Sequence, residues 1–102
     1  RVAGGDINPY LSFAAILGAA ITGIEDGLTP PPPISGNAYE VEMPQLAADW
    51  ATAIDWFAEN PMIARIFHPE LIRNLVMTKR QELAYMSPIP KEDHWKTYLE
   101  TV

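Results

Sequence analysis

Few side chains in this chain have the types and the spacing that chemistry requires. A metal site needs several His, Cys, Asp or Glu side chains clustered at ligand spacing. His68 and His94 are isolated from each other, and the chain contains no cysteine. We expect His68, directly before Pro69, to cap a helix or lie at the surface, and His94 to lie on a polar helix face. The residue types alone therefore predict no metal ligand and no catalytic residue.

The remaining candidates for chemistry are also weak. Glu40 and Glu42 would share one face of an extended segment, but a solvated loop is the simpler interpretation. Gly4-Gly5 is a lone pair, whereas loops that bind phosphate carry longer glycine motifs. No order of Ser, His and Asp residues indicates a nucleophile. Taken by themselves, these residues indicate a helical domain without chemistry of its own.

Composition limits the classes of protein to which the chain can belong. Its 102 residues make one domain or less. The net charge of −6 argues against nucleic-acid binding, which needs a basic surface. The absence of cysteine excludes a disulfide scaffold and fits a reducing compartment. Because no signal peptide opens the sequence, we expect a cytoplasmic protein.

The first predicted element is a helix over residues 7–24, a run without a charged residue. Asn8 suits the N-cap, and Pro9 suits the first helical position because its missing N–H costs nothing there. A helix that is apolar all round is buried on all sides or lies in a membrane. Glu25 and Asp26 follow the run without a basic anchor, which favours a buried core helix over a membrane span.

A proline-rich loop over residues 28–44 should follow. We expect Gly27 to end the first helix, and the regular helix to fray at Gly23 because carboxylates oppose the dipole at a C-terminus. Four prolines at 30–33 favour a stiff polyproline segment, either a spacer or a ligand for an aromatic groove. Residues 38–43 alternate weakly and predict a short extended piece.

The second half of the chain predicts helices only. One runs over about residues 46–59, and a short one begins at Asn60-Pro61. A third runs from Pro69 to about residue 86, and the last begins at about residue 91. The chain is thus predicted to be mainly α, with four to five helices and one long loop.

Several motifs together resemble the C-terminal stretch of the glutamine synthetase family. Arg1 stands nine positions before Tyr10 in a segment that closes with Asn8-Pro9-Tyr10, as at the end of the family's substrate-site strand. Supporting matches are Ala14-Ala15, Gly23-Ile24-Glu25, Gly36-Asn37-Ala38-Tyr39-Glu40, Lys79-Arg80-Gln81-Glu82-Leu83 and the closing Trp95-Lys96-Thr97-Tyr98-Leu99-Glu100. The similarity covers the whole chain.

The resemblance implies that residues 1–102 are the helical C-terminal fragment of an α+β catalytic domain. The parent would be an ATP-dependent ligase that joins glutamate to ammonia or an amine, with Mg²⁺ or Mn²⁺. ATP would phosphorylate the γ-carboxylate, and the amine would displace phosphate. The fragment alone should be inactive and bind neither ATP nor metal. The alternative is a stand-alone helical module whose polyproline loop or tryptophan faces bind a protein.

Arg1 is the one site residue that the resemblance supplies. In the family, the arginine at this position binds the carboxylate of glutamate, a task that suits a planar bidentate donor. Typical members follow this arginine with Phe-Pro-Asp, whereas this chain has Val2-Ala3-Gly4. That pattern is closer to the branch that uses amines such as putrescine. Tyr39 resembles a tyrosine that some bacterial members adenylylate, but its neighbours differ, and we expect it to serve packing.

The resemblance also implies partners, namely the remainder of the parent chain and other subunits of a homo-oligomer, as in dodecameric relatives. In bacterial members the C-terminal helix helps to join two hexameric rings. Trp95, Tyr98, Leu99 and Val102 form an apolar stripe suited to this role. Neither nucleic acid nor membrane is expected as a partner. Because the first helix is apolar on every side, the isolated fragment should self-associate or be partly molten.

Overall fold

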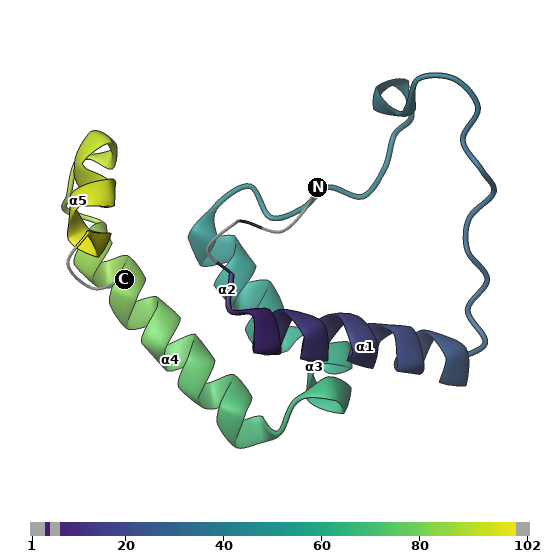
Figure 1. The fold of residues 1–102 in the computed structure, drawn as a ribbon, viewed down its shortest axis with the longest axis horizontal. Helices are drawn as coiled ribbons and strands as arrows, with labels where there is room; N and C mark the ends of the chain where they lie inside the picture. The colour runs from purple at the N-terminus through teal and green to yellow at the C-terminus, as the bar shows by residue number, and fades with distance from the viewer. Residues whose placement is uncertain (1–3, 5–6, 100–102) are drawn as a thin grey trace.

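The computed structural model describes residue 4 and residues 7–99. Their order of elements is α1 (Pro9–Glu25), η1 (Ala38–Glu40), α2 (Trp50–Glu59), α3 (Pro61–Ile66), α4 (Pro69–Met86), η2 (Lys91–Asp93) and α5 (His94–Tyr98), where η marks a 3₁₀ helix. No β-strand occurs among the described residues. The prediction of a mainly helical chain with one long loop is therefore confirmed (Figure 1).

Helix α1 begins where the sequence predicts. The Asn8 side-chain oxygen accepts hydrogen bonds from the backbone N–H groups of Tyr10 at 3.0 Å and Leu11 at 3.2 Å. Pro9 occupies the first turn. The cap satisfies two backbone donors that have no partner within the helix.

The C-terminal end of α1 differs from the prediction of fraying at Gly23. The helix continues to Glu25 and closes with paired backbone hydrogen bonds, from Leu28 to the Gly23 carbonyl at 2.9 Å and from Gly27 to the Ile24 carbonyl at 3.1 Å. Gly27 has a φ of +62°, a left-handed conformation that glycine adopts without a Cβ clash. Gly27 thus ends the helix as predicted, although the last turn does not fray.

A cation from elsewhere in the chain explains why that last turn persists. Arg65 of α3 binds Asp26 through Nη1 at 2.6 Å and Glu25 through Nη2 at 3.1 Å. The guanidinium places positive charge at the negative end of the helix dipole and neutralises the two carboxylates there. The residues next to this helix end give no sign of a partner some 40 positions away in the sequence.

The loop contains a helical turn instead of the predicted extended piece over residues 38–43. Asn37 accepts a hydrogen bond from the Tyr39 backbone N–H at 3.1 Å and donates from Nδ2 to Glu40 at 3.0 Å. These short-range bonds stabilise η1, because an Asn side chain readily bonds the backbone two residues on. The weak alternation of residue types was therefore misleading.

Helix α2 begins at Trp50, four residues later than predicted. Asp49 caps it with two contacts to Thr52, to the backbone N–H at 2.8 Å and to the hydroxyl at 2.9 Å. These hydrogen bonds, first of all the one from the Thr52 backbone, lower the pKa of the Asp49 carboxyl. An Asp directly before the first residue of an apolar helical stripe, here Trp50, is a recognisable N-cap signal that the predicted start at residue 46 does not use.

The later helices begin close to their predicted positions. Asn60 caps α3 through the Met62 backbone N–H at 2.9 Å, and His68 caps α4 by accepting from the Glu70 backbone N–H at 3.3 Å. The capping role expected for His68 is confirmed. The last predicted helix divides into the 3₁₀ turn η2 and the short α5.

The helices pack as two pairs, α2 against α4 and α1 against α3. Their shared core is small. Its buried apolar side chains are Ile54, Phe67, Val76 and Met86. The rings of Phe57 and Phe67 lie 6.2 Å apart and join α2 to the end of α3.

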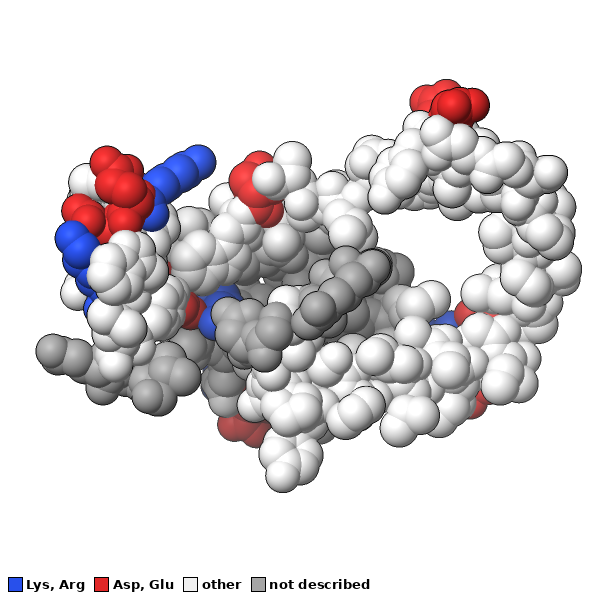
Figure 2. All heavy atoms as spheres, turned by 45° about the horizontal axis from the view of Figure 1, so that its top comes forward, with Lys and Arg blue, Asp and Glu red and all other residues white. Residues whose placement is uncertain are grey.

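Helix α1 is only partly covered by this arrangement. Tyr10 is 84% exposed and Ile24 is 81% exposed, and Thr22 is its one buried residue. The loop after α1 swings away from the helices and leaves an open ring beside them (Figures 1 and 2). Among residue 4 and residues 7–99, no helix has the length and hydropathy needed to cross a bilayer. The predicted burial of α1 on all sides is therefore not achieved within this chain.

Candidate functional site

The single predicted site residue, Arg1, lies outside the described residues. The structure thus neither places its side chain nor tests its role. The described residues closest to it in sequence, Gly4 and Ile7, lie at the rim of a groove. That groove is lined by residues of α1, α2 and α4.

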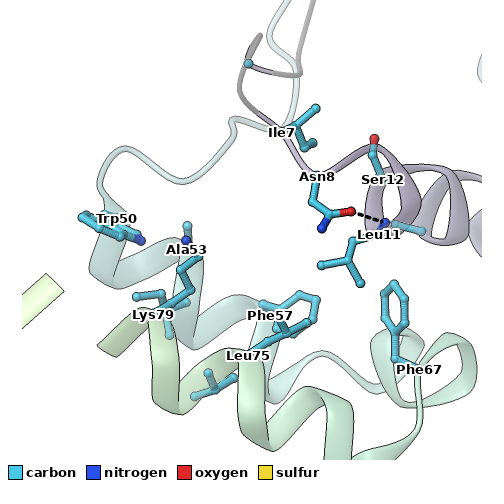
Figure 3. A pocket seen from close by; sticks show the side chains of 14 residues that line it. Ile7, Asn8, Leu11, Ser12, Trp50, Ala53, Phe57, Phe67, Leu75 and Lys79 are labelled. Carbon is cyan, nitrogen blue, oxygen red and sulfur yellow. Dashed lines mark hydrogen bonds between the residues drawn. The ribbon is translucent and has the colours of Figure 1, made fainter. Parts of the chain in front are cut away.

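The groove runs between α1 on one side and α2 and α4 on the other, and it has a volume of about 910 Å³ (Figure 3). Leu11 and Ile7 face Phe57, Leu75 and Ala53 across the opening. The full lining is Gly4, Ile7, Asn8, Leu11, Ser12, Ala15, Trp50, Ala53, Ile54, Phe57, Phe67, Leu75, Val76 and Lys79.

The chemistry of this lining suits apolar binding and not catalysis. Lys79 is the single charged side chain in it, and its Nζ is paired with Glu82 at 2.7 Å. The side-chain oxygen of Asn8 is engaged in capping α1. The lining therefore offers neither a nucleophile beside a base nor an unpaired charge for a polar substrate.

A second polar cluster joins the last two helices. Glu82 of α4 accepts a hydrogen bond from the Tyr98 hydroxyl of α5 at 2.5 Å, and its other oxygen binds Lys79. The bond from Lys79 first, and then that from Tyr98, lower the pKa of the Glu82 carboxyl. The spacing of Lys79 and Glu82 on one helix could have predicted their pairing. The contact with Tyr98 depends on how α5 folds back, for which the sequence holds no signal.

The two histidines lie apart and serve structure. His94 is half-buried, and its Nε2 lies 2.8 Å from the Ile89 carbonyl oxygen, so it links α5 to the turn before it. The expected position on a polar face is thus only partly correct. Within the described ranges, no three His, Cys, Asp or Glu side chains are grouped to hold a metal ion. The described residues therefore do not fit a divalent metal.

The loop carries the remaining candidate residues. Tyr39 is 99% exposed, so the described residues do not make the packing contacts expected for it. Tyr39 belongs to η1, the helical turn within the long loop that extends away from the helices (Figure 1). Glu40, in η1, and Glu42, which follows it, are exposed, as expected for a solvated loop.

Comparison with known proteins decides the family. The sequence model described as "Glutamine synthetase, catalytic domain" matches residues 1–98. The chain belongs to the glutamine synthetase family. The resemblance inferred from Arg1, Asn8-Pro9-Tyr10 and the later motifs is therefore confirmed.

Individual relatives include both branches of this family. A glutamate–isopropylamine ligase from a Pseudomonas species is 34% identical over all of this chain and 23% of its own length. A gamma-glutamylethanolamide synthetase from Streptomyces coelicolor is 31% identical over 81% of this chain and 18% of its own. A glutamine synthetase from Aquifex aeolicus is 34% identical over 89% of this chain and 21% of its own. No solved structure matches the chain.

The chain matches only part of each of these relatives. It spans about a quarter of the length of these relatives or less. The matches favour membership of a ligase family over the alternative of a stand-alone interaction module.

Proposed function

We propose that residues 1–102 are the C-terminal part of the catalytic domain of an ATP-dependent ligase. The parent enzyme joins the γ-carboxylate of glutamate to ammonia or an amine. The observation that carries this proposal is the match of the family's catalytic domain to residues 1–98, almost the whole chain. The names of the amine-specific relatives support an amine acceptor, in line with Val2-Ala3-Gly4 after Arg1.

In this proposal, the described helices support the active site and supply little chemistry themselves. ATP and Mg²⁺ or Mn²⁺ would be held by the remainder of the parent, because the described residues group no metal ligands. Arg1 would contribute the one substrate contact, a bidentate pair with the glutamate carboxylate. The cap at Asn8 and the ion pairs of Arg65 would fix the helix that follows this contact.

The proposal is tested by replacing Arg1 in the parent enzyme. A hydrogen bond between charged groups contributes about 1.5–3 kcal/mol, so Arg1→Ala should lower kcat/KM for glutamate by about 10- to 100-fold. Phosphate release with ATP, magnesium, glutamate and either ammonia or putrescine gives the rate. Arg73→Ala, at an exposed position of α4, is the matched control and should leave the rate unchanged.

Two results would contradict the proposal. One is an unchanged kcat/KM in the Arg1→Ala enzyme. The other is a parent that forms no γ-glutamyl amide with ammonia or with any amine. The 102-residue chain alone should release no phosphate above a blank. Turnover by this chain would show that the ATP and metal sites do not lie in the remainder of the parent.

We further propose that the parent is a homo-oligomer in which α5 contacts another subunit. Trp95 of α5 is 59% exposed and Leu99, directly after α5, is 67% exposed, although so short a helix needs packing to persist. Deleting residues 91–102 from the parent should reduce the assembly to smaller species that remain folded. Sedimentation velocity measures this, and an assembly of unchanged mass would count against the contact.

A further inference from the structure

We propose that the outward side of α1 is a permanent docking surface for the part of the parent polypeptide that precedes residue 1. This inference rests on the proposed function only in that it makes residues 1–102 the C-terminal part of a longer chain. The surface is defined by five large apolar side chains, which we call the outer stripe: Tyr10, Phe13, Leu17, Ile21 and Ile24.

The outer stripe follows one side of the helix. Its members are spaced by three, four, four and three residues, close to the 3.6 residues of a helical turn, so they lie one above the other. They are between 56% and 84% exposed, with Ile21 and Tyr10 at the two limits. The described residues therefore leave this side of α1 uncovered along most of its length.

The opposite side of α1 fixes the direction in which the outer stripe points. Thr22 is buried there, and Gly18 leaves room for the side chain of Ile66 in α3. Arg65 of α3 holds the C-terminal end of the helix through the Asp26 carboxylate. Turning the outer stripe inward would break these contacts, so its cover must come from outside the described residues.

The residue types around the outer stripe fit a contact that stays closed. Residues 7–24 contain no charged side chain, whereas interfaces that open and close carry a polar rim. Permanently buried interfaces resemble the core of a domain, and an exposed apolar patch of this kind marks an interaction site. The partner that fits the outer stripe therefore presents apolar, uncharged side chains.

The position of α1 along the chain identifies this partner. It is the first helix of the described residues, and consecutive elements of a polypeptide usually lie next to each other in space. The chain covers 23% of the Pseudomonas ligase and 21% of the Aquifex synthetase, so most of each relative lies outside the matched part. A short connection gives a neighbouring segment an effective concentration in the millimolar range. The preceding polypeptide thus has an advantage over a second copy of the chain.

Photo-cross-linking in the parent enzyme tests this assignment directly. Benzoylphenylalanine in place of Phe13 replaces one aromatic side chain of the outer stripe by another that reacts with whatever covers it. The same replacement of Tyr39, which is 99% exposed on the loop, is the matched control. After irradiation, a denaturing gel separates single from joined subunits, and mass spectrometry maps the linked peptides.

The label at position 13 should link to a peptide that precedes residue 1, in a product with the mass of one subunit. The label at position 39 should form little of this product. A product with the mass of two subunits would identify a neighbouring copy as the cover of α1 and overturn the inference. Equal yields from the two labels, or no link from position 13, would also overturn it.

Thiol labelling provides a second measurement with a smaller change. Ala14, beside the outer stripe, and Ala38, in the loop, are both exposed, and the chain contains no native cysteine. In a parent whose other cysteines are replaced by serine, Ala14→Cys should react with iodoacetamide at least ~100-fold more slowly than Ala38→Cys, because a covered thiol reacts only after local opening. In the 102-residue chain at nanomolar concentration, the two rates should be similar. Equal rates in the parent would contradict the assignment.

Ligase activity measured on the same samples separates this inference from the proposed function. An active parent in which position 14 reacts freely overturns only the docking surface. An inactive parent in which position 14 is protected and position 13 links to the preceding polypeptide contradicts only the proposed activity.

Discussion

At the scale of single residues, Arg65 has the most informative contacts in the molecule. It binds two consecutive carboxylates at the end of α1, Asp26 at 2.6 Å and Glu25 at 3.1 Å. The hydrogen bond from Arg65 holds the pKa of the Asp26 carboxyl below its usual value. The same bond, with a smaller contribution from Glu25, raises the pKa of Arg65. One side chain thus joins α1 to α3 and stabilises a helix end that its own residues oppose.

The lowered pKa of Asp26 predicts a loss of stability in acid. A carboxyl whose pKa is lower in the folded chain stabilises folding above its unfolded value, near pH 4, and loses that contribution as the pH falls through the folded value. We expect Asp26→Asn to lower the thermal midpoint at neutral pH, and the difference from the native chain to shrink below about pH 4. Thermal unfolding followed by circular dichroism between pH 2 and pH 7 measures this (about the range in which carboxyls titrate).

The control for this prediction is Glu59→Gln. The Glu59 carboxylate is exposed and forms no ion pair within the described ranges. Its replacement should have little effect at any of these pH values. A constant difference between the Asp26→Asn protein and the native chain down to the lowest pH would contradict the assigned role of the carboxylate.

At the scale of elements, α1 and α3 approach closely at Gly18. A Cβ built there would lie 2.4 Å from Ile66 Cγ2 and 3.1 Å from Ile66 Cβ. The position therefore requires glycine because of packing, even though glycine weakens a helix interior by about 1 kcal/mol relative to alanine. Gly23 of the same helix differs, because its nearest neighbour would be Leu28 Cδ1 at 3.9 Å, an ordinary contact.

This contrast provides a matched pair of variants. Gly23→Ala should stabilise the chain by about 0.5–1 kcal/mol through helix propensity. Gly18→Ala gains the same propensity but forces Ile66 aside, and overpacking of this kind costs about 1–3 kcal/mol. Urea unfolding at one fixed protein concentration should thus rank Gly23→Ala above the native chain and Gly18→Ala below Gly23→Ala. Equal free energies of unfolding for the two variants would show that α1 and α3 do not pack as described.

The helix boundaries were predictable from the sequence only in part. Helix starts were predictable where the capping residue stands next to a proline, as at Asn8 and Asn60, because both signals are local. The start of α2 was placed too early because apolar residues before the helix resembled its first turn. The extent of α1 depends on Arg65, a contact between distant segments that local patterns do not contain.

The candidate site was less predictable than the fold. The family could be identified from Arg1 and Asn8-Pro9-Tyr10, because their spacing is specific. The groove could not be predicted, since it joins residues of α1, α2 and α4 whose juxtaposition depends on how the helices cross. The exposure of Tyr39 was also missed, because it depends on a loop that extends away from the helices.

At the scale of the whole molecule, the chain is more open than an independent domain of its length. Its accessible surface is 8852 Å². Compact monomers of this size expose about 5,700 Å². The radius of gyration is 16.6 Å. About 13 Å is expected for a compact domain of this length. Charged side chains gather near η2–α5 and at the tip of the loop (Figure 2). The exposed surface of α1, in contrast, contains many large apolar side chains.

This surplus predicts that the isolated chain associates with itself. A standard protein interface buries about 1,600 Å², which is less than the excess surface of roughly 3,000 Å². Burial of apolar area contributes about 25 cal/mol per Å², so even a few hundred Å² favour association by several kcal/mol.

Sedimentation velocity at micromolar concentration should show species larger than a monomer. The double variant Ile16→Lys and Ile24→Lys, on exposed positions of α1, should shift the population toward monomer. Met77→Lys, similarly exposed on α4, controls for added charge. A compact monomer with strong near-ultraviolet tryptophan signals would instead indicate that these helices form a self-sufficient domain.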